Sequence, residues 1–418
     1  MSETALVTND AIALGLLTTI LGGIFYTSTS SHPFWQKFYR FIPALLLCYF
    51  LPSLLNTFGI VDGDTSKLYF VASRYLLPAC LVLLILSVDL KAILSLGPKA
   101  LIMFLTGTVG IVIGGPIALL IISAINPEVI GGHGPDAVWR GMTTLAGSWI
   151  GGGANQAAMK EIYGAGGNIF SVMVTVDVIV ANIWMAVLLF MASKAKEIDA
   201  KTGADTSAID VLKSKVEQYH AEHARIPSLR DLMLIVAIGF GVTGLAHFAA
   251  DFLGPYFEAN YPWTQAYSLT SKFFWLIVLV TSVGLALSFS PVRHIEAAGA
   301  SKVASAFLYI LVATIGLHMD VSKLADEANL WYFAIGIIWM LVHATFMLLV
   351  AKLIKAPLFY MAVGSQANVG GAASAPVVAA AFHPALAPVG VLLAVLGYAL
   401  GTYMAWLCGQ ILQLIAVA

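Results

Sequence analysis

Charge is scarce in this 418-residue chain, because Asp, Glu, Lys and Arg together make up only 10% of it and the formal net charge is -1. Nucleic-acid binding requires a basic surface, so this balance argues against such a partner. Cysteine is also rare. Cys48, Cys80 and Cys408 lie in apolar stretches without metal-ligand spacing, and we interpret them as small core residues rather than as disulfides or metal ligands.

Sequence signatures of enzymes are missing as well. The chain contains no P-loop, HExxH, CxxC or GxSxG motif, so we expect neither an enzyme, nor a bound cofactor, nor transport powered by ATP on this chain. The N-terminus carries Glu3 and Asp10 and no Lys or Arg before the first apolar run. A cleavable signal peptide has the opposite charge, so we expect the first run to remain as a helix.

Apolar residues dominate instead, at 60% of the chain, and the mean hydropathy is +0.89. Runs of about 20 apolar residues, enough to cross a hydrocarbon core of about 30 Å, recur along the whole chain. We therefore predict an all-α polytopic protein of the bacterial inner membrane, in contact with lipid. The expected spans are 9–26, 39–57, 68–88, 99–124, 168–192, 231–252, 271–290, 303–318, 330–353 and 387–416.

Two polar, glycine-rich segments interrupt these runs and read as copies of one another: GSWIGGGANQAAM from Gly147 and GSQANVGGAASAP from Gly364. These two glycines are 217 residues apart, and Gly152 and Gly370 are 218 apart. A second pair of similar phrases, LSVDLKAIL with Asp89 and LHMDVSKLA with Asp320, is offset by 231. The pattern predicts an internal duplication, with five ordinary spans and one glycine-rich element in each half.

The orientation of the halves depends on whether the glycine-rich elements (139–163 and 358–382) cross the membrane. Crossing elements would make the copies parallel, whereas re-entrant hairpins would make them inverted. The second arrangement gathers most Lys and Arg on one side, which is typical of cytoplasmic loops. We therefore predict two inverted repeats of five transmembrane helices, each with a re-entrant hairpin or broken helix, and both termini outside. The repeats are 1–192 and 229–418.

Residues 193–228 are expected to form a cytoplasmic linker between the repeats. This segment is hydrophilic, and four apolar residues recur in it at helical spacing, which predicts a short amphipathic helix. These residues are Ile209, Leu212, Val216 and Tyr219.

The glycine-rich segments are also the predicted binding site. Irregular backbone at membrane depth is tolerated only where it is buried in protein or lines a wet cavity. Close helix packing explains most glycine clusters in membranes, but the neighbouring amides and hydroxyls favour binding of an ion or solute. The candidates are Ser148, Gly151, Gly152, Gly153, Asn155, Gln156, Ser365, Gln366, Asn368, Gly370, Gly371 and Ser374.

Asp177 and Asn182 lie in the span that follows the first segment. Ionisable residues within spans are costly, so Asp177 is the best candidate for a proton or coupling-ion site, although a purely structural role is the alternative. By the repeat offsets its counterpart is Ala394 or Val395, which suits an asymmetric ion site. We expect Na⁺, if it binds, at three residues: Asn155, Asp177 and Asn368.

Three further ionisable residues lie within spans, and for each of them a functional and a structural interpretation stay open. Arg74 would pair with Asp177 or meet a substrate carboxylate, or would reach the lipid headgroups instead. His247 and His343 would relay protons, or would be hydrogen-bonded core residues.

The phrases GSWIGGGANQAAMKEIYG and VGSQANVGGAASAP, with the Asp-Leu pair after the third span, resemble the YjcL-like family of bacterial and plastid membrane proteins over essentially the whole chain. That family is grouped with the cation:proton antiporter and anion transporter superfamily. The resemblance implies inverted repeats, discontinuous elements near the midplane, and a dimer. The GGxG signature of the glutamate:sodium symporters and 2-hydroxycarboxylate transporters is matched only in part, because Ala154 and Ala372-Ala373 replace its last glycine.

We therefore expect a homodimeric secondary active transporter that couples Na⁺ or H⁺ to a small polar solute by alternating access. The solute would be an organic anion, an amino acid or a short peptide. The hairpins, each with its following span, would move against a scaffold made of the first, second and fourth spans of each half. The alternatives are a cation:proton antiporter that uses Asp177, or a non-transporting membrane receptor or assembly factor that binds a partner through 193–228.

Overall fold

The structure is a computed structural model that describes residues 6–42, 44–63, 65–130, 132–204, 206, 209, 227–317, 329–383 and 386–417. These residues are almost entirely helical, which confirms the all-α prediction for this part of the chain. The helices are α1 (Asp10–Ser28), α2 (Pro33–Phe41), α3 (Ala44–Thr57), α4 (Leu68–Val71), α5 (Leu77–Leu86), α6 (Leu90–Ser95), α7 (Pro98–Ile125), α8 (Val138–Tyr163), α9 (Gly167–Ser193), α10 (Ala195–Thr202), α12 (Leu229–Asn260), α13 (Lys272–Ser288), α14 (Ala300–Gly316), α15 (Asn329–Leu353), α16 (Leu358–Val369), α17 (Gly371–Phe382) and α18 (Ala387–Val417).

Among the described residues, seven helical stretches are long and apolar enough to cross a membrane, or nine if two bent pairs each count as one span. The one expected span that this count leaves out, 303–318, corresponds to α14, which has 17 residues. The expected span 39–57 is divided in the structure, because its first residues belong to the separate short helix α2. The linker stripe beyond Ile209 and the phrase around Asp320 lie outside the described residues.

Local sequence fixes several helix ends. Asn9 accepts a hydrogen bond from the backbone N–H of Ala11 (2.8 Å) and so caps α1. Ser228 and Asp231 form a capping box that starts α12 directly after the linker. A π-helical turn, Ala72–Leu76, joins α4 to α5 within one span. Such turns release a backbone carbonyl from the regular pattern, and here the ring of His247 on α12 binds the carbonyl of Arg74 at 2.8 Å.

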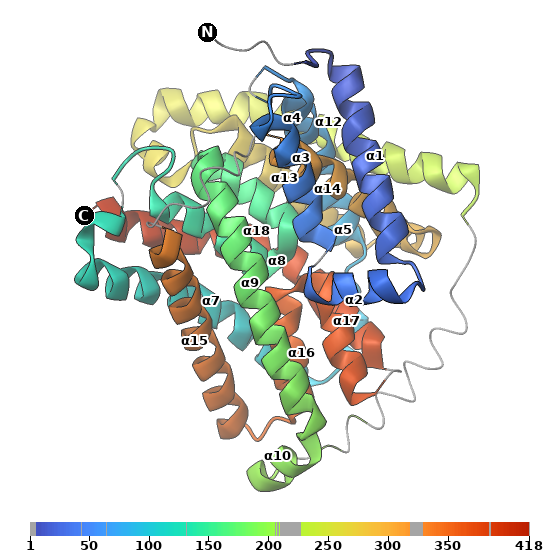
Figure 1. Ribbon diagram of the computed structural model, residues 1–418, viewed down its shortest axis with the longest axis vertical. Coiled ribbons are helices and arrows are strands. Elements are labelled where there is room, and N and C mark those ends of the chain that lie inside the picture. The colour runs from blue at the N-terminus through green and yellow to red at the C-terminus, as the bar shows by residue number, and fades with distance from the viewer. Residues whose placement is uncertain are drawn as a thin grey trace.

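The helices form two bundles that pack against each other (Figure 1). One bundle, the outer bundle, contains α1, α3, α5, α12, α13 and α14. The other, the hairpin bundle, contains α7, α8, α9, α15, α16, α17 and α18. Helices α5 and α13 contact α8 and α18 and so join the two bundles.

The expectation that the fourth span of each half packs with the first and second spans is wrong. These fourth spans are α7 and α15, and both belong to the hairpin bundle. Glycines on one face of α7 allow α15 to come very close: a side chain on Gly114 would begin 2.7 Å from the Trp339 ring, and one on Gly110 would begin 3.4 Å from the His343 Cα. The third spans, α5 and α14, contribute to the outer bundle instead.

The first glycine-rich element, α8, folds back on itself and is called hairpin 1 (Val138–Tyr163) below. Its two ends touch, since the rings of Trp139 and Tyr163 lie 6.0 Å apart and Arg140 donates a hydrogen bond to the Tyr163 carbonyl. In a straight helix residues 24 positions apart would be separated by about 36 Å. The turn is at Gly152, whose φ of 73° and ψ of -175° are not helical.

The second element is built in the same way and is called hairpin 2 (Leu358–Phe382, α16 and α17). The rings of Phe359 and Phe382, at its two ends, lie 5.4 Å apart. The turn falls between the two helices at Gly370 and Gly371, and Gly371 has a φ of 57°. The prediction of two interrupted helical elements is therefore confirmed, and in both of them the chain reverses direction.

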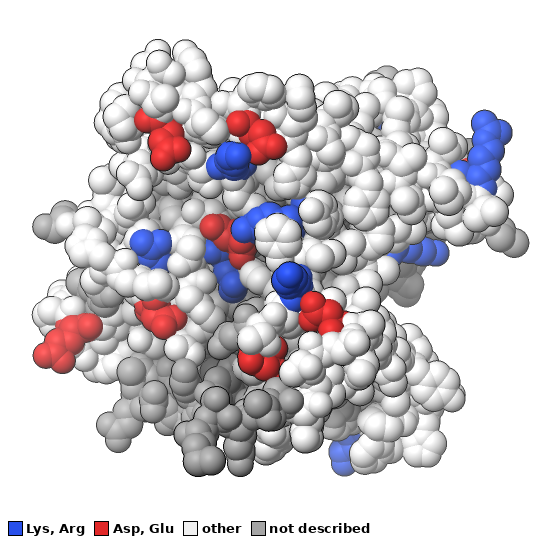
Figure 2. Space-filling model, turned by 90° about the horizontal axis from the view of Figure 1, so that it is seen from above, with Lys and Arg blue, Asp and Glu red and all other residues white. Residues whose placement is uncertain are grey.

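Charged side chains are sparse on the surface of the two bundles. On the face shown in Figure 2, isolated Lys and Arg side chains lie close to Asp and Glu in several places and do not form a patch of one sign. This face agrees with the low charge content of the sequence.

Candidate functional site

The Asp177 carboxylate on α9 is buried, and three side chains of hairpin 1 donate hydrogen bonds to it. Ser148 Oγ lies 2.5 Å from Oδ2, Gln156 Nε2 lies 3.3 Å from Oδ2, and Trp149 Nε1 lies 2.8 Å from Oδ1. All three donors are neutral, and no ion pair of the described residues includes Asp177. A buried carboxylate without a countercharge is costly, so a proton or a small cation would bind favourably here.

The fold of hairpin 1 explains why these donors meet. Ser148 and Trp149 lie on its entering limb and Gln156 lies on its returning limb, so the turn at Gly152 brings them to the same carboxylate. The limbs approach closely because Gly147 has no side chain: a Cβ there would lie 2.6 Å from the backbone oxygen of Asn155. This glycine is therefore a packing residue.

Asn155 ties the returning limb of hairpin 1 to α18. Its amide nitrogen donates to the carbonyls of Gly151 (3.0 Å) and Tyr398 (3.2 Å), and its amide oxygen accepts from the Thr402 hydroxyl (2.7 Å). Thr402 in turn lies 3.1 Å from the hydroxyl of Thr281 on α13. A chain of hydrogen bonds thus runs from the hairpin through α18 to the outer bundle.

Ser365 is the centre of the corresponding cluster in hairpin 2. Trp184 Nε1 donates to its hydroxyl oxygen at 2.8 Å, and His343 Nε2 lies 2.8 Å from the same atom. His343 Nδ1 lies 3.1 Å from the carbonyl of Gly107, which can only accept, so this nitrogen carries the proton. Nε2 then accepts from Ser365 in the neutral ring. Every member of this cluster therefore has a hydrogen-bond partner, and none of them needs to carry a charge.

The same face of α9 serves both clusters. Asp177, which contacts hairpin 1, and Trp184, which contacts hairpin 2, are seven residues apart, or about two helical turns and 10 Å along the axis. The two clusters therefore lie one above the other along a single helix.

Asn368 binds hairpin 2 to α7 in the way that Asn155 binds hairpin 1 to α18. Its nitrogen donates to the carbonyls of Phe104 and Gly364, each at 2.9 Å, and its oxygen accepts from Thr108 at 2.8 Å. Both asparagines are fully buried. Both amide oxygens are already engaged, and neither asparagine shares a hydrogen-bond partner with Asp177. The expected Na⁺ ligands Asn155, Asp177 and Asn368 thus belong to three separate hydrogen-bond clusters.

The turns of the two hairpins meet at Tyr398 of α18. A Cβ on Gly152 would lie 3.5 Å from its ring, and its hydroxyl accepts a hydrogen bond from the backbone N–H of Ala372 in the turn of hairpin 2. Space is open beside both turns, because a Cβ on Gly371 would meet nothing within 4 Å and one on Gly153 would meet only Leu308 methyl groups, the nearer at 3.9 Å.

A polar atom without a partner lies close to the turn of hairpin 2. Gln366 Nε2 donates to Ser374 Oγ at 2.7 Å across the turn, but the buried Oε1 of Gln366 has no hydrogen-bond partner. The buried hydroxyl of Tyr49 on α3 is likewise unpartnered. Unsatisfied buried polar atoms are rare and usually belong to sites that a ligand, ion or water completes.

Neither Arg74 nor Asn182 is bonded to Asp177 in the structure. Arg74 pairs with Glu161 at the end of hairpin 1 (2.6 Å) and not with Asp177, which was one of its expected partners. Tyr69 donates to the same carboxylate and accepts from Lys160 at 2.9 Å. Asn182 bonds to the carbonyl of Val178 in its own helix at 2.6 Å and contributes to neither cluster.

The remaining sequence-predicted residues have distinct positions. Gly151 packs directly against α18, where a Cβ on Gly401 would lie 2.6 Å from the Gly151 Cα. Gly370 forms the turn with Gly371, and Ser374 closes it through Gln366.

Sequence reasoning did not assign Trp149, Trp184, Tyr398, Thr108 and Thr402 to the site. Trp184 and Tyr398 lie within apolar runs, where an aromatic residue carries no signal of a polar contact, and Trp149 lies in the first glycine-rich segment among residues with stronger polar character. The two threonines become visible only once the asparagines are known to face them.

A family model described as "Protein of unknown function (DUF819)" matches residues 15–415, so the chain belongs to that family. The chain is also similar to the uncharacterized membrane protein YjcL of Bacillus subtilis (strain 168). The two are 24% identical over 361 residues, which cover 82% of this chain and 84% of the relative. Together with the apolar helices, this confirms a YjcL-like, multi-pass integral membrane protein.

Proposed function

We propose that this member of the family of unknown function is a secondary active transporter of the bacterial inner membrane. It would move a small polar solute, such as an organic anion, an amino acid or a short peptide, together with Na⁺ or H⁺. The observation that carries the proposal is the pair of fold-back hairpins, packed into one bundle around a buried carboxylate that has only neutral donors. Interrupted helices of this kind are typical of transporter binding sites.

The proposed mechanism is motion of the hairpin bundle relative to the outer bundle. The repeats would be inverted, with 1–192 and 229–418 as the two copies, and the hairpins would enter from opposite faces. Each hairpin packs with its following span, α9 or α18, and in this proposal the fourth spans α7 and α15 move with them. The outer bundle would be the scaffold, and a second copy would complete a homodimer.

Coupling would act through Asp177. Ser148, Trp149 and Gln156 hold its carboxylate in place with neutral hydrogen bonds, so binding of Na⁺ or H⁺ would remove a buried charge at low structural cost. A loaded and an unloaded carboxylate differ in the charge that must move with the hairpin bundle, which links the ion to the conformational change.

The solute would bind between the hairpin turns, beside Tyr398. The returning limb of each hairpin begins there, and helix N-termini favour a carboxylate through their free N–H groups and dipole. The open space beside Gly371 and the unpartnered Gln366 Oε1 support this position, because an amide oxygen would accept a hydrogen bond from an amino or hydroxyl group of the solute.

Thermal unfolding of the purified protein in Na⁺ and in choline buffers, across pH and with a panel of carboxylates, amino acids and peptides, tests this proposal. A ligand that binds only the folded state raises the free energy of unfolding by mass action, by about 2.7 kcal/mol at 100 times its Kd, and so raises the melting temperature. We expect an ion-dependent shift that one solute class enlarges and that Asp177→Asn abolishes. The matched control is Asp251→Asn, which changes an exposed Asp on α12 that is paired with Lys272 at 2.9 Å. Equal shifts in both variants would remove Asp177 from the coupling site.

A cation:proton antiporter is the second candidate, because Asp177 alone would suffice as the site at which a cation and a proton are exchanged. Vesicles loaded with a pH-sensitive dye separate the two functions. Cation-driven proton movement without any organic solute would favour the antiporter, whereas uptake that requires a solute would favour the symporter.

A further inference from the structure

We propose a binding site for an anionic phospholipid in a groove between α1 and α14, on the outer bundle. The groove has a volume of about 390 Å³ and is lined by Thr18, Leu21, Gly22 and Phe25 of α1 and by Lys302, Ser305, Ala306, Tyr309 and Ile310 of α14. On each helix these residues follow a spacing of three and four, so one face of each helix forms a wall. One acyl chain of the lipid would lie in the groove, and the phosphate of the lipid headgroup would lie at Lys302.

The walls of the groove suit an acyl chain and not a polar solute. The hydroxyls of Thr18 and Ser305 both donate to carbonyls of their own helices, to Leu14 at 2.8 Å and to Ser301 at 2.8 Å respectively, so their apolar atoms are left to form the wall. Gly22 has nothing within 4 Å of the position where its side chain would begin, which leaves the groove open. The polar groups that remain are Lys302 and the hydroxyl of Tyr309.

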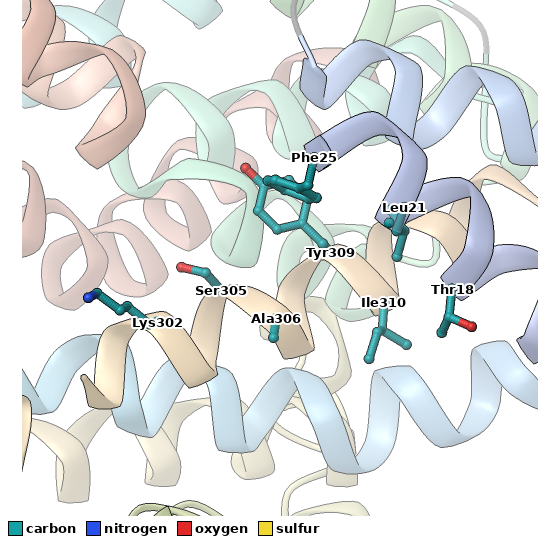
Figure 3. A pocket seen from close by; sticks show the side chains of 9 residues that line it. Thr18, Leu21, Phe25, Lys302, Ser305, Ala306, Tyr309 and Ile310 are labelled. Atoms are coloured by element: carbon teal, nitrogen blue, oxygen red, sulfur yellow. The ribbon is translucent and has the colours of Figure 1, made fainter. Parts of the chain in front are cut away.

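The charge lies at one end of the groove. Figure 3 shows Lys302 at the end opposite Thr18 and Ile310. Lys302 is exposed, is close to the start of α14 and makes no ion pair among the described residues. A neighbouring acid, Glu296, is held by the backbone N–H (3.0 Å) and hydroxyl (2.5 Å) of Ser301. A lysine at the end of an apolar helix extends toward the headgroup region, where it attracts anionic lipids.

The occupant we assign is a lipid because α1 is a surface helix of a membrane protein and Lys302 and Ala306 of the α14 wall are exposed. α1 is long and apolar enough to span the membrane, and only 22% of its best window is buried within the protein. The groove is therefore open on a face that the bilayer surrounds. A second copy of the chain is the competing occupant, and the experiment distinguishes the two.

The experiment measures lipid binding to the purified full-length protein by native mass spectrometry and thermal unfolding, with dioleoylphosphatidylglycerol and dioleoylphosphatidylcholine as probes. We expect the anionic lipid to bind more tightly. Lys302→Gln should lower its affinity about fivefold and leave the zwitterionic lipid unchanged, since each basic residue near the surface contributes about that factor. Gly22→Leu should fill the groove and weaken binding of both lipids.

Two matched controls accompany these variants. Gly23→Leu adds the same side chain at an adjacent exposed glycine of α1 that does not line the groove, and Lys196→Gln removes an exposed lysine of α10. Both should bind lipid like the unchanged protein. Equal affinity for the two lipids, or no effect of Lys302→Gln, would overturn the headgroup assignment. A change of oligomeric state in Gly22→Leu, seen by light scattering, would overturn the proposal in favour of a protomer interface.

Discussion

In hairpin 1 the polar side chains converge on the Asp177 carboxylate, whereas in hairpin 2 they converge on the neutral hydroxyl of Ser365 and the ring of His343. The two hairpins share their glycine turn, their closed ends and an asparagine that binds a neighbouring helix. They differ in the group at the centre of the cluster, which is the Asp177 carboxylate of α9 for hairpin 1 and neutral for hairpin 2. The comparison teaches that the two elements share a backbone design while only hairpin 1 binds an acid of a neighbouring helix, so in the proposed transporter a single acid would set the coupling.

The hairpins also differ in how they are attached to the rest of the protein. The end of hairpin 1 is held to the outer bundle by the cluster of Arg74, Glu161, Lys160 and Tyr69. The start of hairpin 2 is held by Asp199 of the linker helix α10, which accepts a hydrogen bond from the backbone N–H of Leu358 at 2.8 Å. Charged contacts therefore fix hairpin 1 to the opposite bundle, and hairpin 2 to the segment that follows α9.

The largest effect is expected from Gly147→Val, which separates the limbs of hairpin 1. Its side chain would collide with the backbone of Asn155, which cannot rotate away, so we expect a loss of at least about 3 kcal/mol of stability and of the donors around Asp177. Gly153→Ala is the control, because space is open there and the cost should stay below about 1 kcal/mol. Thermal unfolding measures both. Similar melting temperatures for the two variants would contradict the close approach of the limbs.

Asn155→Ala and Asn368→Ala test whether the two hairpins are held in equivalent ways. Each substitution removes the hydrogen bonds of a buried amide to a threonine hydroxyl and to backbone carbonyls, so each should cost about 2 kcal/mol. Chemical unfolding monitored by tryptophan fluorescence gives the two values. A cost that is large in one hairpin and negligible in the other would show that the resemblance between the two anchors is only geometric.

Glu161→Gln should release hairpin 1 from the outer bundle. It leaves Arg74 and Lys160 without their shared partner, and because the Arg74 side chain is 29% exposed we expect a cost of only about 1–2 kcal/mol. Glu197→Gln, in an exposed pair with Lys201 at 2.7 Å, should cost about 0.3 kcal/mol and serves as control. If the two variants unfold alike, the attachment contributes no more than a surface ion pair.

The smallest effect concerns Asp199, whose attachment of hairpin 2 depends on pH. Burial raises the pKa of Asp199, and the Leu358 N–H opposes this in part. An acid whose pKa is higher in the folded state favours folding when protonated, so its contribution is lost as pH rises through that pKa. The unchanged protein should therefore lose stability relative to Asp199→Asn as pH rises from about 4 to 7, as unfolding measured across this range would show. A difference independent of pH would contradict this.

Much of the architecture was readable from the chain itself. Ten apolar runs and two interrupted ones predicted where helices form, and the described helices agree with them to within a few residues except at α2 and at the C-terminal end of α12, which extends to Asn260. Glycine and polar content marked both hairpins, because hydrophobic length and backbone breaks are local properties of the sequence. Asp177 also stood out locally, since an acid within an apolar run is costly to bury and therefore rare.

Tertiary structure alone decided which side chains meet. Trp149, Trp184 and Tyr398 became part of the site because the fold-back of each hairpin and the packing of α9 and α18 bring residues distant in sequence into contact. Arg74 pairs with Glu161, which is 87 residues away in the sequence, and the fourth spans joined the hairpin bundle because glycines on α7 admit α15. Sequence determines where a helix is stable, but partner choice depends on packing between helices, and that is settled only when all of them are assembled.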